Sequence, residues 1–257
     1  MSGFQPDDLT RNAFLGGRIE LLQPRSGYRA GVDPVLLAAV VPAKSGQSVL
    51  ELGCGGGAAS LCLAARVAGV DVTGIELQPE YADLARQNAA HNKISMRVFT
   101  ADLTALPDAL RHIGFDHVIA NPPYYRRGAH SPSHDDGRRV ALGEDTPLSD
   151  WIGTAAKRLA PKGYLHVIQR ADRLPDLLAA CAGRLGSLEI LPLAARVGRA
   201  PDLIILRARK SGRAAFLLHA PVILHEGAGH TADGDSYRPE ITGILRDGAP
   251  LVWPSRR

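Results

Sequence analysis

Four consecutive residues, Asn121-Pro122-Pro123-Tyr124, have the types and order needed to hold a planar amino group for chemistry. The lone pair of such a nitrogen, as in adenine, is conjugated with the ring, so it is a weak nucleophile. The side-chain oxygen of Asn121 and a neighbouring backbone carbonyl can accept the two N–H protons, which directs the lone pair toward a methyl donor. The prolines keep these acceptors rigid, and Tyr124 offers a flat face for stacking. A Pro-Pro loop that only closed a strand would need neither the asparagine nor the aromatic ring.

A glycine-rich turn between a predicted strand and a predicted helix is the second candidate site. It reads Glu51-Leu52-Gly53-Cys54-Gly55-Gly56-Gly57, and glycines let the backbone turn tightly and approach a ligand closely. The dinucleotide pattern GxGxxG would need a third glycine at Ala58, so the sequence disfavours a nicotinamide cofactor. In addition, Glu51 would repel a pyrophosphate but could hold a cationic amino-acid group. A purely structural strand–helix turn is the alternative.

Acidic residues lie at the ends of two further predicted strands. Glu76 closes the strand 71–76 and could accept both ribose hydroxyls of an adenosine lying across the sheet; the alternative is an exposed glutamate ahead of a helix. Because Gly53 and Gly55 precede Glu76 at a suitable distance, the ribose role is favoured. Asp102 follows the strand 96–100 and could accept the adenine amino group, or it could be an N-cap or turn aspartate. Both interpretations of Asp102 stay open.

The elements that must position these residues follow the order of an α/β protein, in which β-branched apolar runs alternate with longer helical patterns. Asp33, as an N-cap, and Pro34 are predicted to open a short helix. Residues 125–146 lack periodicity, and a loop of this length is usually functional or mobile. The predicted strands are 48–52, 71–76, 96–100, 116–120, 164–169, 188–193 and 203–208, and the predicted longer helices are 58–68, 79–91, 148–159 and 172–185.

This pattern predicts one Rossmann-like domain over residues 1–257. Its sheet is expected to be mostly parallel and seven-stranded, with helices on both faces and an antiparallel final strand pair. Residues 1–47 would form an N-terminal preamble with one helix, and 48–210 the core. Residues 211–257 would hold a last strand-like stretch, 214–226, and a polar tail that is expected to be partly disordered.

Composition excludes several classes of protein. The chain has no apolar run of about 18 residues, so no membrane helix is predicted, and its acidic start does not match a secretory signal. Cys54, Cys62 and Cys181 are scattered, which favours a reducing cytoplasm over a disulfide framework or a zinc site. No metal is predicted, because the histidines lack ligand spacing and are expected at surface or loop positions: His91, His112, His117, His130, His134, His219, His225 and His230.

Arginines gather in a few segments although the net charge is only +4. A basic excess in loops fits a phosphate-rich partner such as RNA, while a solvated surface explains the charge equally well. The clustered residues are Arg126, Arg127, Arg138, Arg139, Arg196, Arg199, Arg207, Arg209, Lys210 and Arg213.

With these motifs the chain resembles the class I S-adenosylmethionine-dependent methyltransferases that carry an NPPY tetrad, and more narrowly the bacterial tRNA1(Val) adenine-N6 methyltransferase family. The segment 23–38 resembles that family's preamble, the stretch 198–201 its late GRPA-type segment, and the stretch 221–226 its C-terminal PLVLH sequence. Pro34 departs from the family, which usually has alanine there, and Ala30-Gly31 replaces a more polar pair. These departures leave the exact substrate open.

The resemblance implies roles for individual residues. Asn121 to Tyr124 would be the catalytic tetrad, and Glu51, Gly53 and Gly55 would contact the methionine part of S-adenosyl-L-methionine. Glu76 would hold its ribose and Asp102 its adenine, with Asn121 at the same pocket. The preamble would close over this cofactor, which places Arg29 and Asp33 at the pocket edge.

The implied reaction is methylation of an adenine N6 in RNA, most favourably in a tRNA near the anticodon. Phosphates would be bound by Arg126, Arg127, Arg138, Arg139, Arg196 and Arg199. The same chemistry could instead act on rRNA guanine N2, DNA adenine N6 or protein glutamine N5. A glutamine substrate is disfavoured because only about 45 residues precede the first core strand, too few for a helical bundle that grips a protein. An RNA-binding module that retains only the fold is a non-enzymatic alternative.

Overall fold

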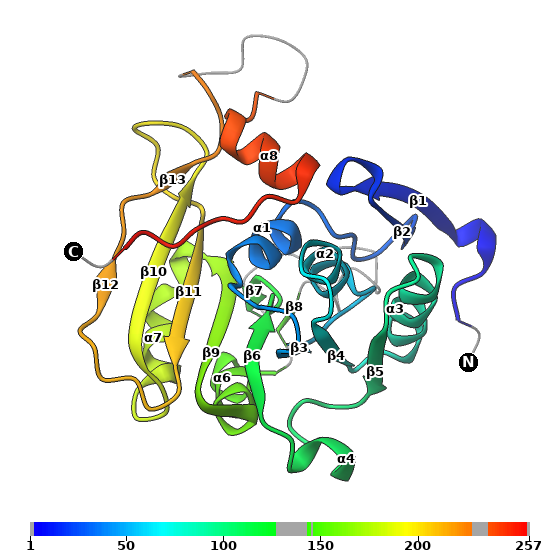
Figure 1. The fold of residues 1–257 in the computed structure, drawn as a ribbon, viewed down its shortest axis with the longest axis horizontal. Helices are drawn as coiled ribbons and strands as arrows, with labels where there is room; N and C mark the ends of the chain where they lie inside the picture. The colour runs from blue at the N-terminus through cyan, green and yellow to red at the C-terminus, as the bar shows by residue number, and fades with distance from the viewer. Residues whose placement is uncertain (1–2, 127–142, 145, 228–235, 256–257) are drawn as a thin grey trace.

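A nine-stranded sheet forms the centre of the described part of the chain (Figure 1). The structure is a computed structural model that describes residues 3–126, 143–144, 146–227 and 236–255, without the side chains of 125, 126, 143 and 144. The spatial order is β12-β10-β11-β9-β6-β3-β4-β5, and β13 also pairs with β10. The strands are β3 (Ser48–Leu52), β4 (Asp71–Glu76), β5 (Met96–Thr100), β6 (Phe115–Ala120), β9 (Leu159–Arg170), β10 (Gly186–Ala194), β11 (Leu203–Arg209), β12 (Leu217–Leu218) and β13 (Val222–Ile223).

The strand directions confirm the predicted fold class. β5, β4, β3, β6 and β9 are parallel, whereas β11 runs antiparallel to both β9 and β10. These are the seven strands that the sequence predicts. The two additional strands, β12 and β13, have two residues each and pair with the outer edge of β10. They replace the single strand expected over 214–226, because Pro221 lies between them and lacks the N–H that a continuous ladder requires.

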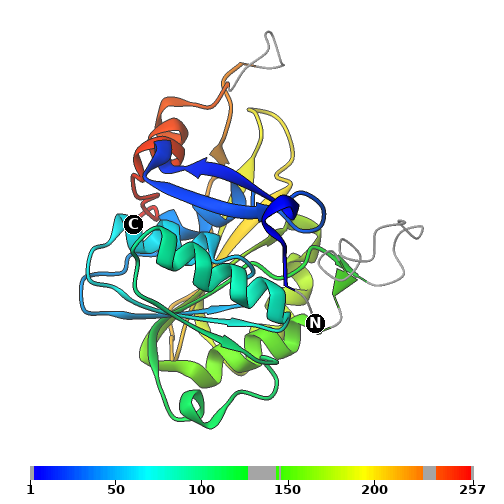
Figure 2. The same ribbon diagram turned by 90° about the vertical axis from the view of Figure 1, so that its right-hand side faces the viewer.

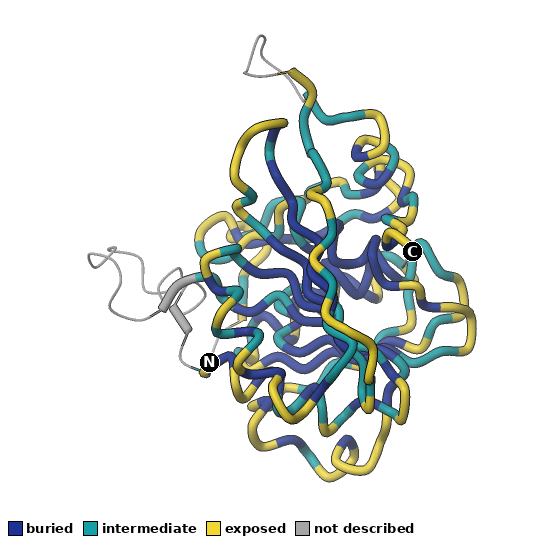
Figure 3. Tube along the Cα trace, turned by 90° about the vertical axis from the view of Figure 1, so that its left-hand side faces the viewer, coloured by how far each residue is buried: buried dark blue, intermediate teal, exposed yellow. Residues whose placement is uncertain are grey.

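Helices cover both faces of the sheet (Figures 1 and 2). The core splits into two apolar clusters, one on each face, and the buried residues concentrate along the central strands (Figure 3). On the first face lie α1 (Asp33–Val40), α2 (Ala58–Arg66), α3 (Pro79–His91) and α8 (Pro239–Asp247). On the second lie α4 (Asp108–Arg111), α6 (Leu148–Arg158) and α7 (Leu174–Cys181). Within the described residues, every helix is too short or too polar to span a lipid bilayer.

The preamble contains a β-hairpin that the sequence analysis did not predict. β1 (Leu9–Phe14) and β2 (Ile19–Pro24) pair antiparallel, and the hairpin lies beside α3 (Figure 2). The connecting turn contains Gly16, whose φ is 64°. A Cβ at this glycine would lie 2.7 Å from the carbonyl oxygen of Arg246. The turn therefore requires glycine both for its left-handed backbone and for its contact with the C-terminal segment.

The C-terminal tail is also more ordered than predicted. α8 begins at Pro239 and ends before Gly248, whose φ of 67° terminates the helix. Its Ile241 and Ile244 are buried in the same cluster as α1. Farther on, the indole of Trp253 donates to the carbonyl of Val40 at 3.0 Å. The tail is therefore ordered over residues 236–255, whereas residues 228–235, where partial disorder stays a prediction, lie outside the described residues.

Two of the histidines expected at surface or loop positions have little-exposed side chains. His117 lies on β6 with 4% of its surface exposed, and the His219 side chain is 8% exposed. Burial lowers the pKa of His117 to about 4, although Asp116 partly opposes this shift. The His117 ring lies beside that of His166 on β9, which is fully buried. His117 lies on a strand and is buried, so the surface or loop prediction is wrong for this residue. His219 lies in a loop, as predicted, although its ring packs against Trp253 and its Nε2 lies 2.9 Å from Oε2 of Glu189.

Candidate active site

A cavity of about 490 Å³ lies at the carboxyl ends of β3, β4, β5 and β6. In a parallel sheet these ends meet at one edge, which is where open α/β sheets bind ligands. The preamble supplies the opposite wall through the segments 21–24 and 27–31. Every residue predicted for the site lines this one cavity: Arg29, Asp33, Glu51, Gly53, Gly55, Glu76, Asp102, Asn121, Pro122, Pro123 and Tyr124.

The glycine turn after β3 has a conformation that side chains would obstruct. Gly53 and Gly55 have φ of 63° and 52°, and Gly57, with a φ of 87°, is the N-cap of α2. A Cβ on Gly53 would lie 2.4 Å from the indole ring of Trp151 on α6. The glycine at position 53 thus lets α6 close the second face of the cavity.

Glu51 is buried at the end of β3. Its Oε2 accepts hydrogen bonds from the backbone N–H of Ser60 at 3.0 Å and from the Ser60 hydroxyl. Burial raises the pKa of Glu51 to about 8, with the nearby carboxylate of Glu76 adding to the rise and the Ser60 bonds opposing it. A cation bound in the cavity would lower this pKa again, so Glu51 is suited to a positively charged ligand.

Glu76, at the end of β4, is held by backbone donors. Its Oε2 accepts from Gly55 N–H at 2.8 Å and its Oε1 from Gln78 N–H at 2.9 Å. Burial raises the pKa of Glu76, and these backbone bonds oppose the rise. The glycine turn and the acidic residue predicted beside it are therefore in direct contact, and the carboxylate has a fixed orientation.

Asp102 lies at the mouth of the cavity and is exposed. Its Oδ1 accepts from the backbone N–H and from the hydroxyl of Thr104, both at 2.7 Å. This is the turn geometry that the sequence analysis weighed against an adenine contact. The turn geometry and an adenine contact are compatible, because Asp102 also lines the cavity.

The Asn121 side chain is aimed by the preamble. Its Nδ2 donates to the Tyr28 hydroxyl at 3.5 Å, while its Oδ1 is buried and has no hydrogen-bond partner in the described structure. A buried acceptor without a donor is costly, of the order of 1–3 kcal/mol, so an unpartnered oxygen that lines a cavity calls for an explanation. The free oxygen therefore fits an N–H group brought in by a ligand.

Tyr124, the last residue of the tetrad, is bound to the first turn of α1. Its hydroxyl donates to Oδ2 of Asp33. The sequence analysis expected Asp33 to be the N-cap of this helix, but the N-cap is Val32 and no side chain caps the helix. The Asp33 carboxylate bonds the tetrad instead of the helix backbone.

Arg29 is near the cavity, but its guanidinium is engaged by the hairpin. It donates to Thr10 Oγ1, to the carbonyl of Pro24 and to Asn12 Oδ1, at 2.8, 2.6 and 2.9 Å. These contacts hold the preamble in shape.

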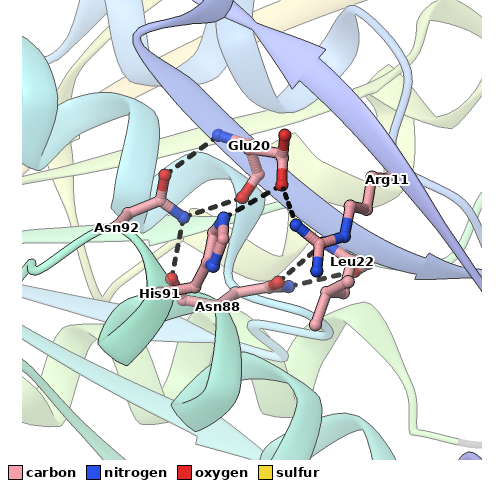
Figure 4. A network of polar contacts seen from close by, with 6 residues as sticks. All are labelled: Arg11, Glu20, Leu22, Asn88, His91 and Asn92. Carbon is pink, nitrogen blue, oxygen red and sulfur yellow. Dashed lines mark hydrogen bonds and ion pairs between the residues drawn. The ribbon is translucent and has the colours of Figure 1, made fainter. Parts of the chain in front are cut away.

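The hairpin itself is bound to α3 by two asparagines one helical turn apart (Figure 4). Asn88 accepts from Leu22 N–H at 2.7 Å and donates to Leu22 O at 3.1 Å and Gly56 O at 2.9 Å. Asn92 bonds the N–H and carbonyl of Glu20 in the same way, at 2.9 and 2.8 Å. Asn88 thus ties β2 to the glycine turn and fixes the wall of the cavity.

The predicted RNA-binding arginines have different outcomes. Arg196 is 8% exposed and donates to Glu226 O, Gly227 O and Ser236 Oγ, so its predicted phosphate contact is wrong. Arg199 is exposed. Arg127, Arg138 and Arg139 lie outside the described residues, as does the Arg126 side chain.

Several residues of the site were not found from the sequence: Tyr28, Ser60, Asn88, Trp151 and Gln169. A polar Asn88 on the buried side of α3, four residues before Asn92, was the available signal. The others belong to ordinary core or loop patterns. Only the tertiary structure brings Tyr28 and Trp151 to the cavity, and Ser60 and Gln169 to the residues that line it.

The charges around the cavity fit a cationic ligand. Its described lining contains four acidic residues, Asp33, Glu51, Glu76 and Asp102, and one basic residue, Arg29, which the hairpin engages. The described residues contain no cluster of three or more metal-ligating side chains. A pyrophosphate would be repelled here, whereas the ammonium and sulfonium charges of a methyl-donating nucleoside would be stabilised.

Comparison with known proteins agrees with this geometry. The model of the methyltransferase small domain matches residues 30–189, which is more than half of the chain. A tRNA1(Val) (adenine(37)-N6)-methyltransferase of Porphyromonas gingivalis is 37% identical over 169 residues, covering 62% of this chain. An Escherichia coli relative with the same description is 31% identical over 166 residues. The match spans 66% of each relative's length, slightly less than two thirds.

Solved structures show the same fold. A predicted O-methyltransferase from Agrobacterium tumefaciens is 30% identical, with a TM-score of 0.70, and the match covers 87% of this chain and 100% of that one. A T. thermophilus 16S rRNA N2 methyltransferase, solved with S-adenosylmethionine and guanosine, has a TM-score of 0.54 at 21% identity, covering 79% of this chain and 50% of that one.

The site fits a methyl donor, through the glycine turn and the acidic lining, and an acceptor that carries N–H groups, through the unpartnered Asn121 oxygen. The chain therefore belongs to the methyltransferase small-domain family, and its cofactor is S-adenosyl-L-methionine.

Proposed function

We propose that this enzyme methylates the exocyclic N6 amino group of an adenine in RNA, with a tRNA as the substrate. The observation that carries the proposal is the buried, unpartnered Oδ1 of Asn121, which lines the same cavity as the ring of Tyr124. An extruded adenine has both features that this arrangement needs, a flat ring and a pair of amino protons.

The tetrad would act by accepting hydrogen bonds from both amino protons before the methyl group is transferred; the methylated nitrogen, which then carries a positive charge, would release one of these protons to give the neutral product. Asn121 Oδ1 would bind one N–H, and a carbonyl of the Pro122-Pro123 pair would bind the other. With both protons held in these directions, the nitrogen lone pair turns away from the ring. Tyr28 supports this role, because it accepts from Nδ2 of Asn121 and so leaves the oxygen for the substrate.

The cofactor supplies an electrophilic methyl group on a sulfonium. We propose that Glu51, Gly53 and Gly55 bind its amino-acid part, that Glu76 accepts from its ribose hydroxyls and that Asp102 contacts its adenine. Two observations support these assignments. The Glu76 carboxylate has a fixed orientation, and the buried Glu51 has a raised pKa that a bound cation would lower. Asp33 and Arg29 would act indirectly, by holding the tetrad and the preamble in place.

The tRNA substrate is inferred from the named relatives, two of which methylate adenine 37 of tRNA1(Val) by description. Arg126, Arg127, Arg138 and Arg139, together with the exposed Arg199, are the proposed phosphate contacts. Such contacts position an RNA without reading its sequence and weaken as salt rises.

Methylation of an oxygen is the second candidate, because the solved Agrobacterium protein is described as a predicted O-methyltransferase. A hydroxyl acceptor needs a base to remove its proton. Asp33 is a carboxylate close to the tetrad, but its Oδ2 already accepts a hydrogen bond from the Tyr124 hydroxyl. The amide acceptor at Asn121 therefore favours nitrogen over oxygen.

We also propose that residues 1–257 form a single methyltransferase domain. Within the described residues, the hairpin, α8 and Trp253 pack on the same apolar cluster as α1 and α2, which supports a single shared core.

The product can be identified directly. The enzyme is incubated with cofactor carrying a labelled methyl group and with total tRNA, rRNA, DNA or a release factor, and the label is located by mass spectrometry. The proposal expects labelled N6-methyladenosine from the tRNA fraction. Label on guanine, on a protein glutamine or on a ribose oxygen would replace the proposed substrate by that acceptor.

A further inference from the structure

We propose that Gln169 is a positioning residue that sets the direction of the two proline carbonyls in the tetrad. The inference deepens the proposed function and rests on it, since it assigns a support to the backbone acceptor that the reaction requires. Gln169 lies near the end of β9 and is fully buried.

One amide group of Gln169 contacts both prolines. Its Nε2 donates to the carbonyl oxygens of Pro122 and Pro123, each at 3.3 Å. Its Oε1 accepts from the N–H of Arg170 at 2.8 Å, which fixes which end of the amide faces the tetrad. The register explains the placement: Val167 pairs with Ala120, so the next residues of β9 run alongside the start of the tetrad.

The proline pair creates the need for this side chain. β6 ends at Ala120, and the two prolines that follow Asn121 have no N–H. The backbone there cannot donate the hydrogen bonds that would extend the pairing with β9. The carbonyls of the two prolines still require donors, because Pro122 is buried and buried carbonyls are nearly always paired. A side-chain NH₂ has two protons and can therefore serve two carbonyls at once.

The hydrogen bonds from Gln169 determine the direction in which each proline carbonyl can accept a further proton donor. A carbonyl oxygen has two lone pairs, and a donor on one of them leaves the other in a defined direction. Gln169 would therefore orient the second lone pair of the proline carbonyl toward the substrate amine. Loss of this donor should reduce the methyl-transfer step more than it reduces cofactor binding.

The first test uses Gln169→Leu and Gln169→Glu, with Gln87→Glu on the exposed side of α3 as the control for added charge. In Gln169→Leu, single-turnover methyl transfer should fall about 10- to 100-fold, with the cofactor Kd changed less than threefold. Gln169→Glu should be active at low pH, where the protonated carboxyl can donate, and lose activity as the pH rises. Equal rates in all variants, or a loss that follows the cofactor Kd, would overturn the inference.

The second test needs no activity. Pro122-Pro123 is the only Pro-Pro pair and Pro123-Tyr124 the only Pro-Tyr pair in the chain, so selective 13C and 15N labelling of proline and tyrosine isolates both carbonyls by NMR. Gln169→Leu should shift both carbonyl resonances upfield, and Gln87→Glu should leave them unchanged. Unshifted carbonyls in Gln169→Leu contradict the hydrogen bonds themselves.

The two tests separate this inference from the proposed function. If the wild type labels a substrate other than tRNA, the proposed substrate is wrong. The kinetic series is then run on the labelled substrate, and it still tests the positioning role of Gln169. If the carbonyls shift but methyl transfer is unaffected, the bonds exist and the positioning role is wrong.

Discussion

The hydroxyl of Tyr124 donates a hydrogen bond to the carboxylate of Asp33. This bond joins the loop after β6 to the first turn of α1, across 91 positions of the sequence. Together with the contact between Tyr28 and Asn121, it means that the preamble holds both ends of the tetrad. The ring of Tyr124 is consequently fixed before any substrate enters.

The Asp33–Tyr124 bond should be measurable as a coupling. Asp33→Ala and Tyr124→Phe each remove one partner, and the double variant removes both. We expect a coupling free energy of about 1–3 kcal/mol in denaturant unfolding. If the losses of unfolding free energy in the two single variants add up to the loss in the double variant, the two side chains do not stabilise each other. Gln87→Glu with Tyr124→Phe is the additive control pair, because Gln87 lies on the exposed side of α3 and shares no hydrogen bond or ion pair with Tyr124 in the described part of the chain.

Cofactor binding should release a proton from Glu51. Its pKa is raised to about 8 by burial, so most of this carboxyl is protonated at pH 7. A cationic ligand favours the ionised form, so affinity should increase from pH 6 to 7.5. Calorimetry in buffers of different ionisation enthalpy measures the released protons, and Glu51→Gln should release fewer. Identical proton release from both proteins would place the linked group elsewhere.

Gly53→Ala should destabilise the protein and impair cofactor binding. The new methyl group would meet the Trp151 ring at 2.4 Å, and the φ of 63° disfavours alanine. We expect a loss of about 1–3 kcal/mol in the free energy of unfolding. Gly153→Ala is the control, because it lies within α6 with open space around its Cβ position. That substitution should stabilise the protein by about 0.5–1 kcal/mol. A Gly53→Ala variant as stable as the wild type would show that α6 does not pack on the turn.

The buried histidines should make the fold acid-sensitive. The pKa of His117 is about 4 in the folded protein and about 6.5 when unfolded. The unfolded state therefore binds the proton first, and the stability from this group is complete above about pH 6.5 and lost as pH falls through about 4. The difference corresponds to up to about 3 kcal/mol. Unfolding in denaturant at pH 7 and pH 5 should show a smaller pH effect for His117→Leu than for the wild type. An equal pH effect would assign the acid sensitivity to other groups.

The core elements were predictable because parallel strands covered on both faces are continuous apolar runs. β3, β4, β5 and α3 have the predicted boundaries. The glycine turn, Glu76 and the tetrad also meet in one cavity, as the strand order required. Local sequence fixes these features because each depends on residues close together in the chain.

The additions at both ends were missed for a different reason. Gly16 in the hairpin turn and Pro239 with Gly248 around α8 were visible signals, but a short hairpin and a short helix become stable only by packing on a core. Contacts such as Gln169 with Pro122, or Asn88 with Leu22, depend on strand register and helix docking. Neither can be derived from spacing in one sequence.

The most direct test of the tetrad mechanism is Asn121→Ala, measured for cofactor affinity and for single-turnover methyl transfer in the same preparation. Removal of the Oδ1 acceptor should lower the transfer rate by about 100-fold or more, while the cofactor Kd stays within a few-fold of the wild type. Asn121→Ala turnover at the wild-type rate would contradict the account, because the amino protons would then not be held by this side chain.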